Sequence, residues 1–464
     1  MPPAESFAGK SAEMQHVPAV RRTWQGSKEA HHLFGFHDVS PWNVRYDRML
    51  SLEVATIDHP PLTSEPARVG LLDLQTQAFH EHDTTTGWNF PQGARQLWLC
   101  DRSRYAYNCP DGDQPRTRIR DQSGRLIREL PWGVAAVGPS SDVLYSLDFG
   151  RVHRAGGYGH TGSRPWSSAD PVERAGGLVS VEINSGAAQT LASLADCRRV
   201  TGRPDVAAEQ AGSLDYVTHV VPSPSGARVS FLYRSWYADG GIDTALCVVD
   251  SNGANLRMVL RGNLSHFDWR DEESIVIWGP RGRTITKLRG KGGGRRGLAT
   301  IVLKLAKDVL RPIVRRSGML ASAYLLVPLD GSPPKPFFPD ILTGDGHPSF
   351  CPSKREWMLA DTYPNPAGQR ELFLVNTTKG DKHSLGIFTE LKMQVNPAKS
   401  QAAMAEVDPS ILRIIGKDLY SFTRSGLHCD LHPRWRSDGK QVTFDSLHEG
   451  SRQIYVVDTA GIVE

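Results

Sequence analysis

Histidines recur at one place in a pattern that repeats along the chain. Three of them, His219, His347 and His432, stand six residues before the first turn residue of their own repeat. His266 is one residue out of step, and Arg95 takes the equivalent place in another repeat. Neutral imidazole is the commonest side-chain metal ligand, so several converging rings would bind Mn, Zn or a similar divalent ion. The alternative is that each histidine is a structural hydrogen-bonding residue between neighbouring repeats.

A second group of residues has the chemistry to hold an acidic ligand. A guanidinium group binds a carboxylate at two points. The arginines expected around the mouth, unless they are merely solvated at the surface, are Arg95, Arg151, Arg154, Arg234 and Arg434. The Gly-rich segment 146–160 is either a flexible excursion or a binding loop on a rigid scaffold. The expected ligand-binding residues are His37, Gln92, Arg95, His153, Tyr158, Arg234 and His266.

Each repeat consists of short strands joined by tight turns. In the last repeat, a turn at Ser437–Lys440 precedes an alternating strand at Gln441–Asp445 and a further strand at Gln453–Asp458. An Asp-Gly pair beside an alternating run is a strong turn signal, because Gly tolerates positive φ. Seven such units predict an all-β, seven-bladed β-propeller, whose innermost strands begin around a central channel. The residues expected to meet there are His219, His266, His347 and His432, with His37, Arg95 and His428 nearby.

The propeller is expected to span residues 19–464, after a disordered leader at 1–18. Composition agrees, since 44 Gly and 31 Pro in 464 residues favour short strands and turns over helices. The blades are predicted at about 31–85, 86–132, 133–197, 215–262, 263–329, 345–386 and 427–458. Arg21 to Trp24 is expected to add an outer strand to the last blade, and the connection 387–425 to hold a short helix. Asp361 and Asp445 close strands, and blade-to-blade hydrogen bonding is expected of them.

A basic insertion interrupts the fifth blade at residues 281–317. Twelve Lys and Arg residues stand against Asp308 alone between 281 and 316, whereas the whole chain has a net charge of +4. Its segment Leu298–Leu310 is amphipathic. The insertion is expected to dock on an anionic membrane surface, to bind a polyanion, or to form a solvated, partly disordered arm. Nucleic acid is not an expected partner, because no aromatic residues are interleaved for base stacking.

The sequence favours a cytoplasmic location, and the insertion at 281–316 leaves membrane association open as one alternative. The first 25 residues lack the apolar run of about 7–15 residues that a secretory signal needs, and no window reaches the ~18 apolar residues of a membrane span. The six cysteines show no CxxC spacing, so we expect reduced and mostly structural thiols.

The segments HPRWRSDGKQVTFDS and HPSFCPSKREWMLADTY carry a family resemblance. Their blade pattern resembles that of TolB-like propellers. The arrangement of histidines is similar to that of oligogalacturonate lyases, seven-bladed propellers that cleave uronate oligosaccharides with a metal held by His and Gln side chains. The segments FGFHDVSPWN, PQGARQLWL, SLDFGRVHRAGGYGH, SHFDW, GDGHPSF and CDLHPRW also resemble uncharacterised propeller proteins of bacterial exopolysaccharide gene clusters. The resemblance covers nearly the whole chain from His31, apart from the insertion.

The lyase resemblance implies a divalent metal, such as Mn, on His347, His428 and His432. The ligating Gln of that family has no clear counterpart here, since Leu427 or Asp430 occupies the region. The resemblance also implies an arginine base, for which Arg151 is the candidate.

Two functions follow from the sequence. The first is β-elimination on a 4-linked hexuronate in an acidic oligosaccharide, with Arg151 or His219 accepting the C5 proton and a histidine or water protonating the leaving O4. Arg95 and Arg234 would hold the other carboxylates of the substrate. The alternative is a non-catalytic propeller that binds an acidic saccharide or a protein partner at the inner face of the membrane in exopolysaccharide assembly. Propellers host many unrelated functions, so the fold does not decide between these two.

Overall fold

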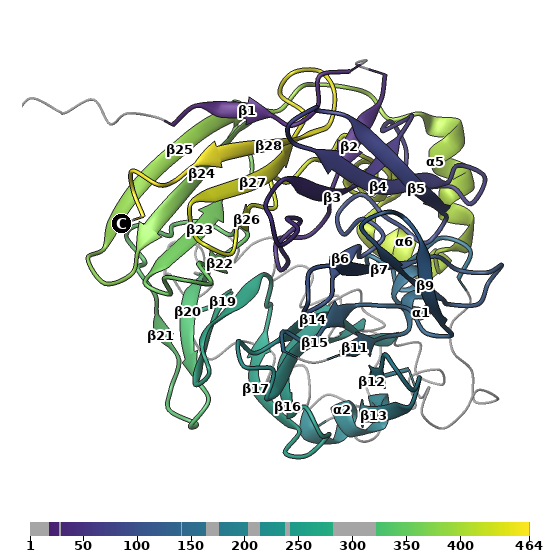
Figure 1. Ribbon diagram of the computed structural model, residues 1–464. Helices are drawn as coiled ribbons and strands as arrows, with labels where there is room; N and C mark the ends of the chain where they lie inside the picture. The colour runs from purple at the N-terminus through teal and green to yellow at the C-terminus, as the bar shows by residue number, and fades with distance from the viewer. Residues whose placement is uncertain are drawn as a thin grey trace, which may run out of the picture.

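The strands of the chain are arranged as seven blades around a centre. The structure, a computed structural model, describes residues 18–26, 29–140, 142–163, 176–202, 214–236, 242–281 and 322–463. Its strands form seven four-stranded antiparallel sheets, which radiate from one axis (Figure 1). The predicted seven-bladed β-propeller is therefore confirmed. The predicted leader at 1–18 and the insertion at 281–317 lie outside the described residues, except for Pro18 and Arg281.

The first four blades follow the predicted limits closely. The first contains β2 (His31–Leu33), β3 (Arg48–Val54), β4 (Ala67–Asp73) and β5 (Phe79–Thr85), and the second contains β6 (Leu97–Trp98), β7 (Arg104–Asn108), β8 (Thr117–Asp121) and β9 (Leu126–Leu130). The third contains β10 (Ala136–Val137), β11 (Val143–Ser146), β12 (Leu178–Glu182) and β13 (Ala188–Ala192). The fourth contains β14 (Asp215–Pro222), β15 (Arg228–Trp236), β16 (Ile242–Asp250) and β17 (Arg257–Gly262).

The last three blades extend the pattern past some predicted limits. The fifth contains β18 (Phe267–Asp271), β19 (Ser274–Pro280), β20 (Ser322–Pro328) and β21 (Lys335–Pro336), and the sixth contains β22 (Ser349–Phe350), β23 (Trp357–Asp361), β24 (Gln369–Asn376) and β25 (Asp381–Thr389). Thus β21 lies beyond the predicted end at 329, and β25 runs past 386. The sequence hides β21 because its prolines interrupt any alternating pattern, and an outer strand tolerates proline since it pairs on one side only.

The two ends of the chain meet in the seventh blade. This sheet contains β26 (Arg434–Trp435), β27 (Gln441–Ser446), β28 (Gln453–Asp458) and, outermost, β1 (Val20–Arg22). Val20 pairs with Val457 and Arg22 with Tyr455, so the purple and yellow strands lie side by side (Figure 1). The expected closing strand is confirmed, although it ends at Arg22 instead of Trp24. Pairing the first strand with the last covers the edge of β28.

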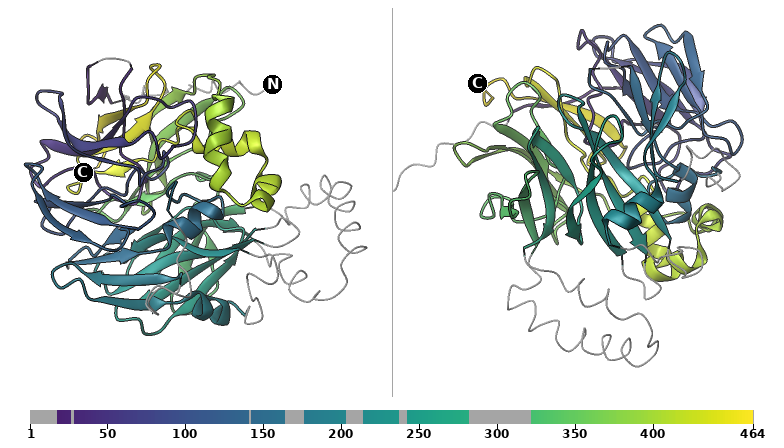
Figure 2. Two further views of the ribbon diagram at one scale, coloured as in Figure 1. Left: turned by 90° about the vertical axis from the view of Figure 1, so that its right-hand side faces the viewer. Right: turned by 90° about the horizontal axis from the view of Figure 1, so that it is seen from below.

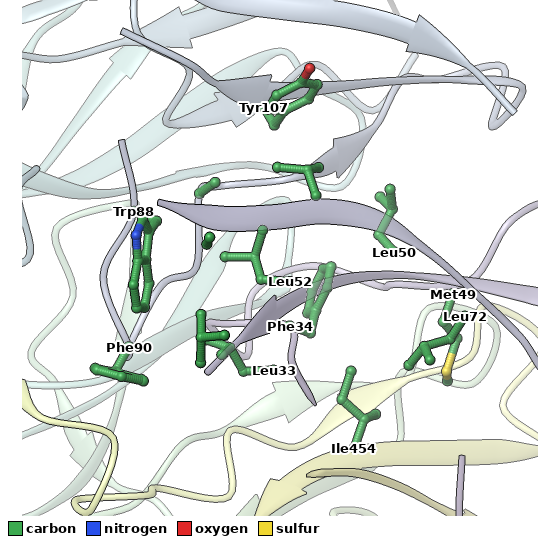
Figure 3. Packing of buried hydrophobic residues seen from close by; sticks show 14 of the residues in the cluster. Leu33, Phe34, Met49, Leu50, Leu52, Leu72, Trp88, Phe90, Tyr107 and Ile454 are labelled. Atoms are coloured by element: carbon green, nitrogen blue, oxygen red, sulfur yellow. The ribbon is translucent and has the colours of Figure 1, made fainter. Parts of the chain in front are cut away.

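Apolar side chains fill the spaces between neighbouring blades. Separate buried clusters join blades two and three, three and four, four and five, five and six, and six and seven. The largest cluster joins blades seven, one and two, and Figure 3 shows Phe34 of blade one between Ile454 of β28 and Tyr107 of β7. Each sheet therefore buries both faces, which explains why the inner strands are apolar almost throughout.

Tryptophans at one repeat position tie blades together. The indole Nε1 of Trp98 donates to the carbonyl of Pro41 at 2.7 Å, that of Trp269 to Val221 at 3.1 Å, and that of Trp435 to Ser349 at 2.9 Å. Each indole thus bonds the blade that precedes its own. Each tryptophan also stands three residues after Arg95, His266 or His432. The same indole hydrogen bonds therefore hold the starts of these innermost strands in place.

The long connection before the last blade is helical. It contains α5 (Pro397–Ala403), a short 3-10 turn, α6 (Pro409–Ile415) and α7 (Lys417–Arg424), where a single short helix was expected. Side chains of Asn396 and Asp408 accept backbone N–H groups at the starts of α5 and α6. The helices form one group, which packs against the segment following α1 (Phe149–Arg154) (Figure 2). Another helix, α2 (Leu194–Val200), links blades three and four. No helix among the described residues has the length and apolarity to cross a membrane.

Candidate functional site

The predicted histidines meet at the centre of the ring. The ring centroids of His266 and His347 are 4.2 Å apart, and those of His347 and His432 are 4.4 Å apart. Phe36 lies among them, with its ring 4.9 Å from that of His432 and 5.1 Å from that of His219. His37 joins the group at 5.3 Å from His347. Residues far apart in the sequence therefore form one buried imidazole cluster, as the repeat offsets predicted.

The backbone turns these residues inward. Arg95, His219 and His432 have φ values of 50°, 54° and 42°, in the left-handed region that non-glycine residues rarely adopt. They stand at the same offset in their repeats, so one local conformation recurs in blades two, four and seven, whereas His347 at that offset in blade six does not adopt it. At His219 the ladder between β14 and β15 also shifts register, between Thr218 and Val221. Strained residues and β-bulges are concentrated at functional sites, where they aim a side chain.

Three residues of the cluster form a candidate metal centre. Ligand atoms of His347, Asp430 and His432 all lie within 4.8 Å of one another. Nε2 of His347 and Nδ1 of His432 are buried and have no hydrogen-bond partner among the described residues. Buried polar atoms are nearly always hydrogen-bonded, so two such nitrogens beside a carboxylate are suited to bind a cation. Two nitrogens and an oxygen fit Mn²⁺ or Zn²⁺.

The outer partners of these residues also suit a metal centre. Nδ1 of His347 lies 2.9 Å from each carboxylate oxygen of Asp361, which also accepts the backbone N–H of His347 at 2.7 Å. A carboxylate that holds one ring nitrogen leaves the other nitrogen free as a ligand, which is the usual arrangement at metal sites. Asp430 accepts from Nη1 of Arg370 at 3.0 Å. Asp361 therefore bonds to a residue of its own blade, and it does not form the blade-to-blade hydrogen bond that the sequence suggested.

The charges at two of the three residues favour cation binding, whereas Asp361 raises the pKa of His347 above its usual value in spite of burial, so a metal must displace a proton from that ring. Burial disfavours a charged Asp430, but His428, His347 and Arg370 hold the pKa of its carboxyl well below the usual value. Burial, together with His347 and Arg434, holds the pKa of His432 well below its usual value. Asp430 is therefore a carboxylate and His432 a neutral imidazole at neutral pH. Both are in the protonation state that a metal ligand requires.

His428 does not join this triad. Its Nε2 lies 3.2 Å from a carboxylate oxygen of Asp430, and its ring contacts Phe422. The predicted ligand set of His347, His428 and His432 stays a prediction, and the geometry groups Asp430, in place of His428, with the other two residues. His428 lies behind Asp430 and helps to orient it.

A small hollow of about 10 Å³, barely enough for one water molecule, lies among blades two, three and four. Its described lining includes Gln92, Arg95, Tyr158 and His219 from the predicted ligand-binding set, and does not include the triad. Phe36 contacts His219 on one side and His432 on the other. The triad therefore lies outside this hollow, although Phe36 contacts a histidine of each.

Most of the predicted arginines are already paired with carboxylates. Arg95 makes a two-point contact to Asp38 at 2.8 and 2.9 Å, and Arg434 binds Asp445 at 2.9 Å with both side chains fully buried. Asp445 also accepts the backbone N–H of Phe34 in the first blade, as the expected blade-to-blade bond. Arg95 and Arg434 therefore hold neighbouring parts of the ring together; Arg434 is fully buried, whereas Arg95 also lines the hollow, and its role in ligand binding stays a prediction.

Arg151 and His153, both on α1, contact carboxylates outside the histidine cluster. Nη2 of Arg151 lies 2.8 Å from Asp215, which Arg198 binds as well. His153 lies against Glu406 of the helical connection at 3.7 Å instead of the cluster. Arg151 is thus held in an ion-pair network, and we assign it no role in the proposed reaction. Arg154 is exposed.

Arg234 differs from the other arginines. Its Nε is buried without a hydrogen-bond partner, and no ion pair links it to another described residue. Its charge helps to hold the pKa of His219 well below the usual value, after burial as the main cause. Arg234 therefore remains available for an acidic ligand beside His219.

Sequence reasoning missed several residues of the site. Phe36 and Tyr363 are aromatic side chains that no repeat position marks, and Arg370 belongs to β24, a strand without a histidine. Tyr363 follows Asp361 at the end of β23, and its ring centroid lies 5.7 Å from that of His347. The position of Asp361 at a strand end was the one available signal.

Comparisons with known proteins agree with the fold. No protein-family model matches the chain, and no curated protein matches it in sequence. Among solved structures, an oligogalacturonate lyase in complex with manganese is similar, with 12% identity, a TM-score of 0.55, and coverage of 96% of this chain and 95% of that chain. An oligogalacturonate lyase from Vibrio parahaemolyticus has 11% identity, a TM-score of 0.53 and 97% coverage of both chains. The two lyases share the fold of this chain. TolB from Acinetobacter baumannii has a TM-score of only 0.35, which supports no argument.

Proposed function

We propose that this protein is a metal-dependent lyase that cleaves a uronate-containing oligosaccharide by β-elimination. The observation that carries the proposal is the buried triad of His347, Asp430 and His432, in which two ring nitrogens lack partners among the described residues. The similar fold of a manganese-bound oligogalacturonate lyase supports it. Mn is the metal we expect.

The C5 proton of a uronate is a very weak acid until the charge of the neighbouring carboxylate is neutralised. A divalent cation on the triad would supply that neutralisation. His347 and His432 hold their ligating nitrogens without any rearrangement, because Asp361 fixes the ring of His347 and the backbone at His432 is already turned inward.

His219 is the proton acceptor in this proposal. Burial and the charge of Arg234 keep its imidazole neutral, so the ring can take a proton at neutral pH. Its Nδ1 lies 3.0 Å from Oγ1 of Thr218, which fixes the orientation of the ring. A nearby group must then protonate the leaving O4. His266, held by Ser265 and Asp345 at 3.0 and 3.2 Å, is one such group, and water is the other.

The test follows the double bond that elimination creates. Purified protein with MnCl₂ is incubated with a panel of oligouronates, and the ultraviolet absorbance of the unsaturated product is recorded. We expect turnover with at least one substrate, and its loss in His347→Ala and His432→Ala together with loss of bound metal. His80→Ala, an exposed histidine on β5, serves as the matched control. No absorbance change with any member of the panel would refute the lyase.

A second function is favoured by the burial of the site. The imidazoles of the cluster are nearly inaccessible to solvent. Such a centre suits a metal that stabilises the ring of a propeller which binds an acidic saccharide or a protein partner without cleaving it. Retained metal and saccharide binding, with no product formed, would identify this alternative. Its membrane contact through residues 281–316 and its place in exopolysaccharide assembly remain proposals, because the insertion lies outside the described residues except for Arg281.

A further inference from the structure

The candidate site is closed to a saccharide in the described conformation. His347 and His432 are each 2% exposed, and Asp430 is 6% exposed. The hollow among blades two, three and four has a volume of about 10 Å³, which is room for one water molecule and not for a sugar ring. Binding of the substrate proposed above therefore requires part of the protein to move.

Helix α7 contacts both parts of the site. The ring of Phe422 lies 5.5 Å from that of His428, which in turn contacts the triad. Two residues further on, the guanidinium of Arg424 lies 4.6 Å from the ring centroid of Tyr158, which lines the hollow. The helices α5, α6 and α7 stand as one group beside the blades (Figure 2), and we call this group, residues 397–424, the helical cover. One movement of the cover would therefore expose the surroundings of the triad and the hollow together.

The helical cover has a small hydrophobic core of its own. Its buried side chains are Val407, Ile411, Leu412 and Tyr420, which form a cluster separate from those that join the blades. Apolar contact with the blades comes from Trp236 of β15, which packs against this cluster, and from Phe422, which packs against the largest cluster. Segments that bury few apolar side chains open locally at a lower free energy than the whole fold. The cover is therefore suited to open while the blades stay folded.

Polar contacts hold the cover against the blades. Nζ of Lys399 lies 2.7 Å from a carboxylate oxygen of Glu65, and a carboxylate oxygen of Glu406 accepts the backbone N–H of Gly162 at 2.6 Å. Nη2 of Arg424 donates to a backbone carbonyl at 2.6 Å. Water replaces bonds of this kind when they break, so they oppose opening only weakly.

The chain on the two sides of the cover is fixed to different degrees. Among the described residues, no backbone–backbone hydrogen bond holds the segment 391–395, and its first four residues are exposed. After α7, Ser425 is fully buried, and a Cβ atom at Gly426 would lie 2.6 Å from the ring of Phe90. The cover can therefore swing on 391–395 while the closely packed chain at 425–426 keeps Asp430 in place.

We propose that the helical cover opens as one unit and admits metal and saccharide to the candidate site. The identity of what enters rests on the proposed function, whereas the movement does not. The described conformation is the closed state, in which water is excluded from the triad.

Hydrogen exchange followed by mass spectrometry tests the movement in the full-length protein without metal or saccharide. We expect the amides of α5, α6 and α7 to share one protection factor and to exchange at least about 100-fold faster than those of β15 and β24. In Leu412→Ala, which leaves a cavity in the core of the cover, exchange in the cover should be about tenfold faster again, with exchange in β24 unchanged. Leu359→Ala makes a matched cavity between blades six and seven, and it should not accelerate exchange in the cover.

A reversible cross-link tests whether the opening controls access. In a Cys100→Ser background, which removes the exposed native thiol, Glu65→Cys and Lys399→Cys are joined by a short bismethanethiosulfonate that TCEP releases again. Protein loaded with Mn is then mixed with EDTA, and we expect metal release to be about tenfold slower in the cross-linked form than after TCEP. Glu371→Cys and Lys382→Cys are the matched control, because those side chains are also 2.7 Å apart but lie within blade six. Their cross-link should not change the rate.

The outcomes separate the cover from the proposed reaction. Cover amides that exchange as slowly as those of β24, or a Leu412→Ala variant that accelerates both alike, overturn the movement. Metal release at the same rate with and without the cross-link overturns the cover as the route of access. Protein that binds no Mn refutes the metal centre of the proposed function, and the cover then stands or falls with the exchange measurement.

Discussion

Asp361 sets the affinity of the candidate centre for its metal, and replacing it with asparagine measures that contribution. Both carboxylate oxygens lie 2.9 Å from Nδ1 of His347, and one also accepts the backbone N–H of that residue. In Asp361→Asn one oxygen becomes an NH₂ group, so the negative charge that makes the ring a stronger ligand is lost. Loss of such an outer partner typically weakens metal binding about 10–100-fold. This corresponds to about 1.4–2.8 kcal/mol of binding free energy.

The assay is calorimetric titration of MnCl₂ into metal-free protein at pH 7.5. Asp345→Asn is the matched control, because Asp345 contacts His266 and not the triad. We expect one site in all three proteins, with weaker binding in Asp361→Asn alone. Thermal melting of the metal-free proteins checks that each variant is folded. An unchanged Kd in a folded Asp361→Asn protein, or an equal loss in Asp345→Asn, would refute the assignment of the outer partner.

Three further predictions concern stability. Burial lowers the pKa of His153 to about 4 and that of His160 to about 3, from 6.5. The unfolded chain therefore binds more protons below pH 6.5, and each histidine removes up to about 1.4 kcal/mol of stability per pH unit as the pH falls toward its folded pKa. Between pH 6.5 and pH 5 these two histidines together contribute roughly 3 kcal/mol to the change in the free energy of unfolding, so urea unfolding of His160→Phe should show a pH dependence smaller by about 1.6 kcal/mol than that of the wild type; an equal slope in the variant would contradict this. Arg434→Ala leaves Asp445 buried without its closest partner and should cost about 3–5 kcal/mol in the free energy of unfolding, whereas a loss under 1 kcal/mol would show that the pair is not needed. Removing residues 1–22 exposes the edge of β28, so gel filtration should show self-association that a chain beginning at residue 18 does not show.

The repeat offsets in the sequence were enough to predict most of the fold and the members of the histidine cluster. Because strands of equivalent blades begin around one axis, the positions of His219, His347 and His432 in their repeats sufficed to place them together. Even the one-residue displacement of His266 did not matter, since its ring lies 4.2 Å from that of His347. These side chains converge because equivalent blades are arranged symmetrically around one axis. A single sequence shows that symmetry as a repeat.

Pairing of charges could not be predicted in the same way. Arg95, Arg234 and Arg434 look alike in the sequence, yet two of them are bound by carboxylates and one is not. The partner of Arg95 comes from another blade, and its contact depends on backbone positions that no repeat encodes. The third ligand shows the same limit, because Asp430 and His428 are two residues apart and only the local chain path decides which of them faces His347.

The antiparallel pairing of β1 with β28 also determines how the ring resists mechanical force. Both chain ends leave that ladder on the same side, since Val20 pairs with Val457 and Arg22 with Tyr455. Tension applied to the two termini therefore peels the ladder one rung at a time and does not shear all of its rungs together. The seventh blade should detach at low force, while the other six are shielded from the load until it has opened.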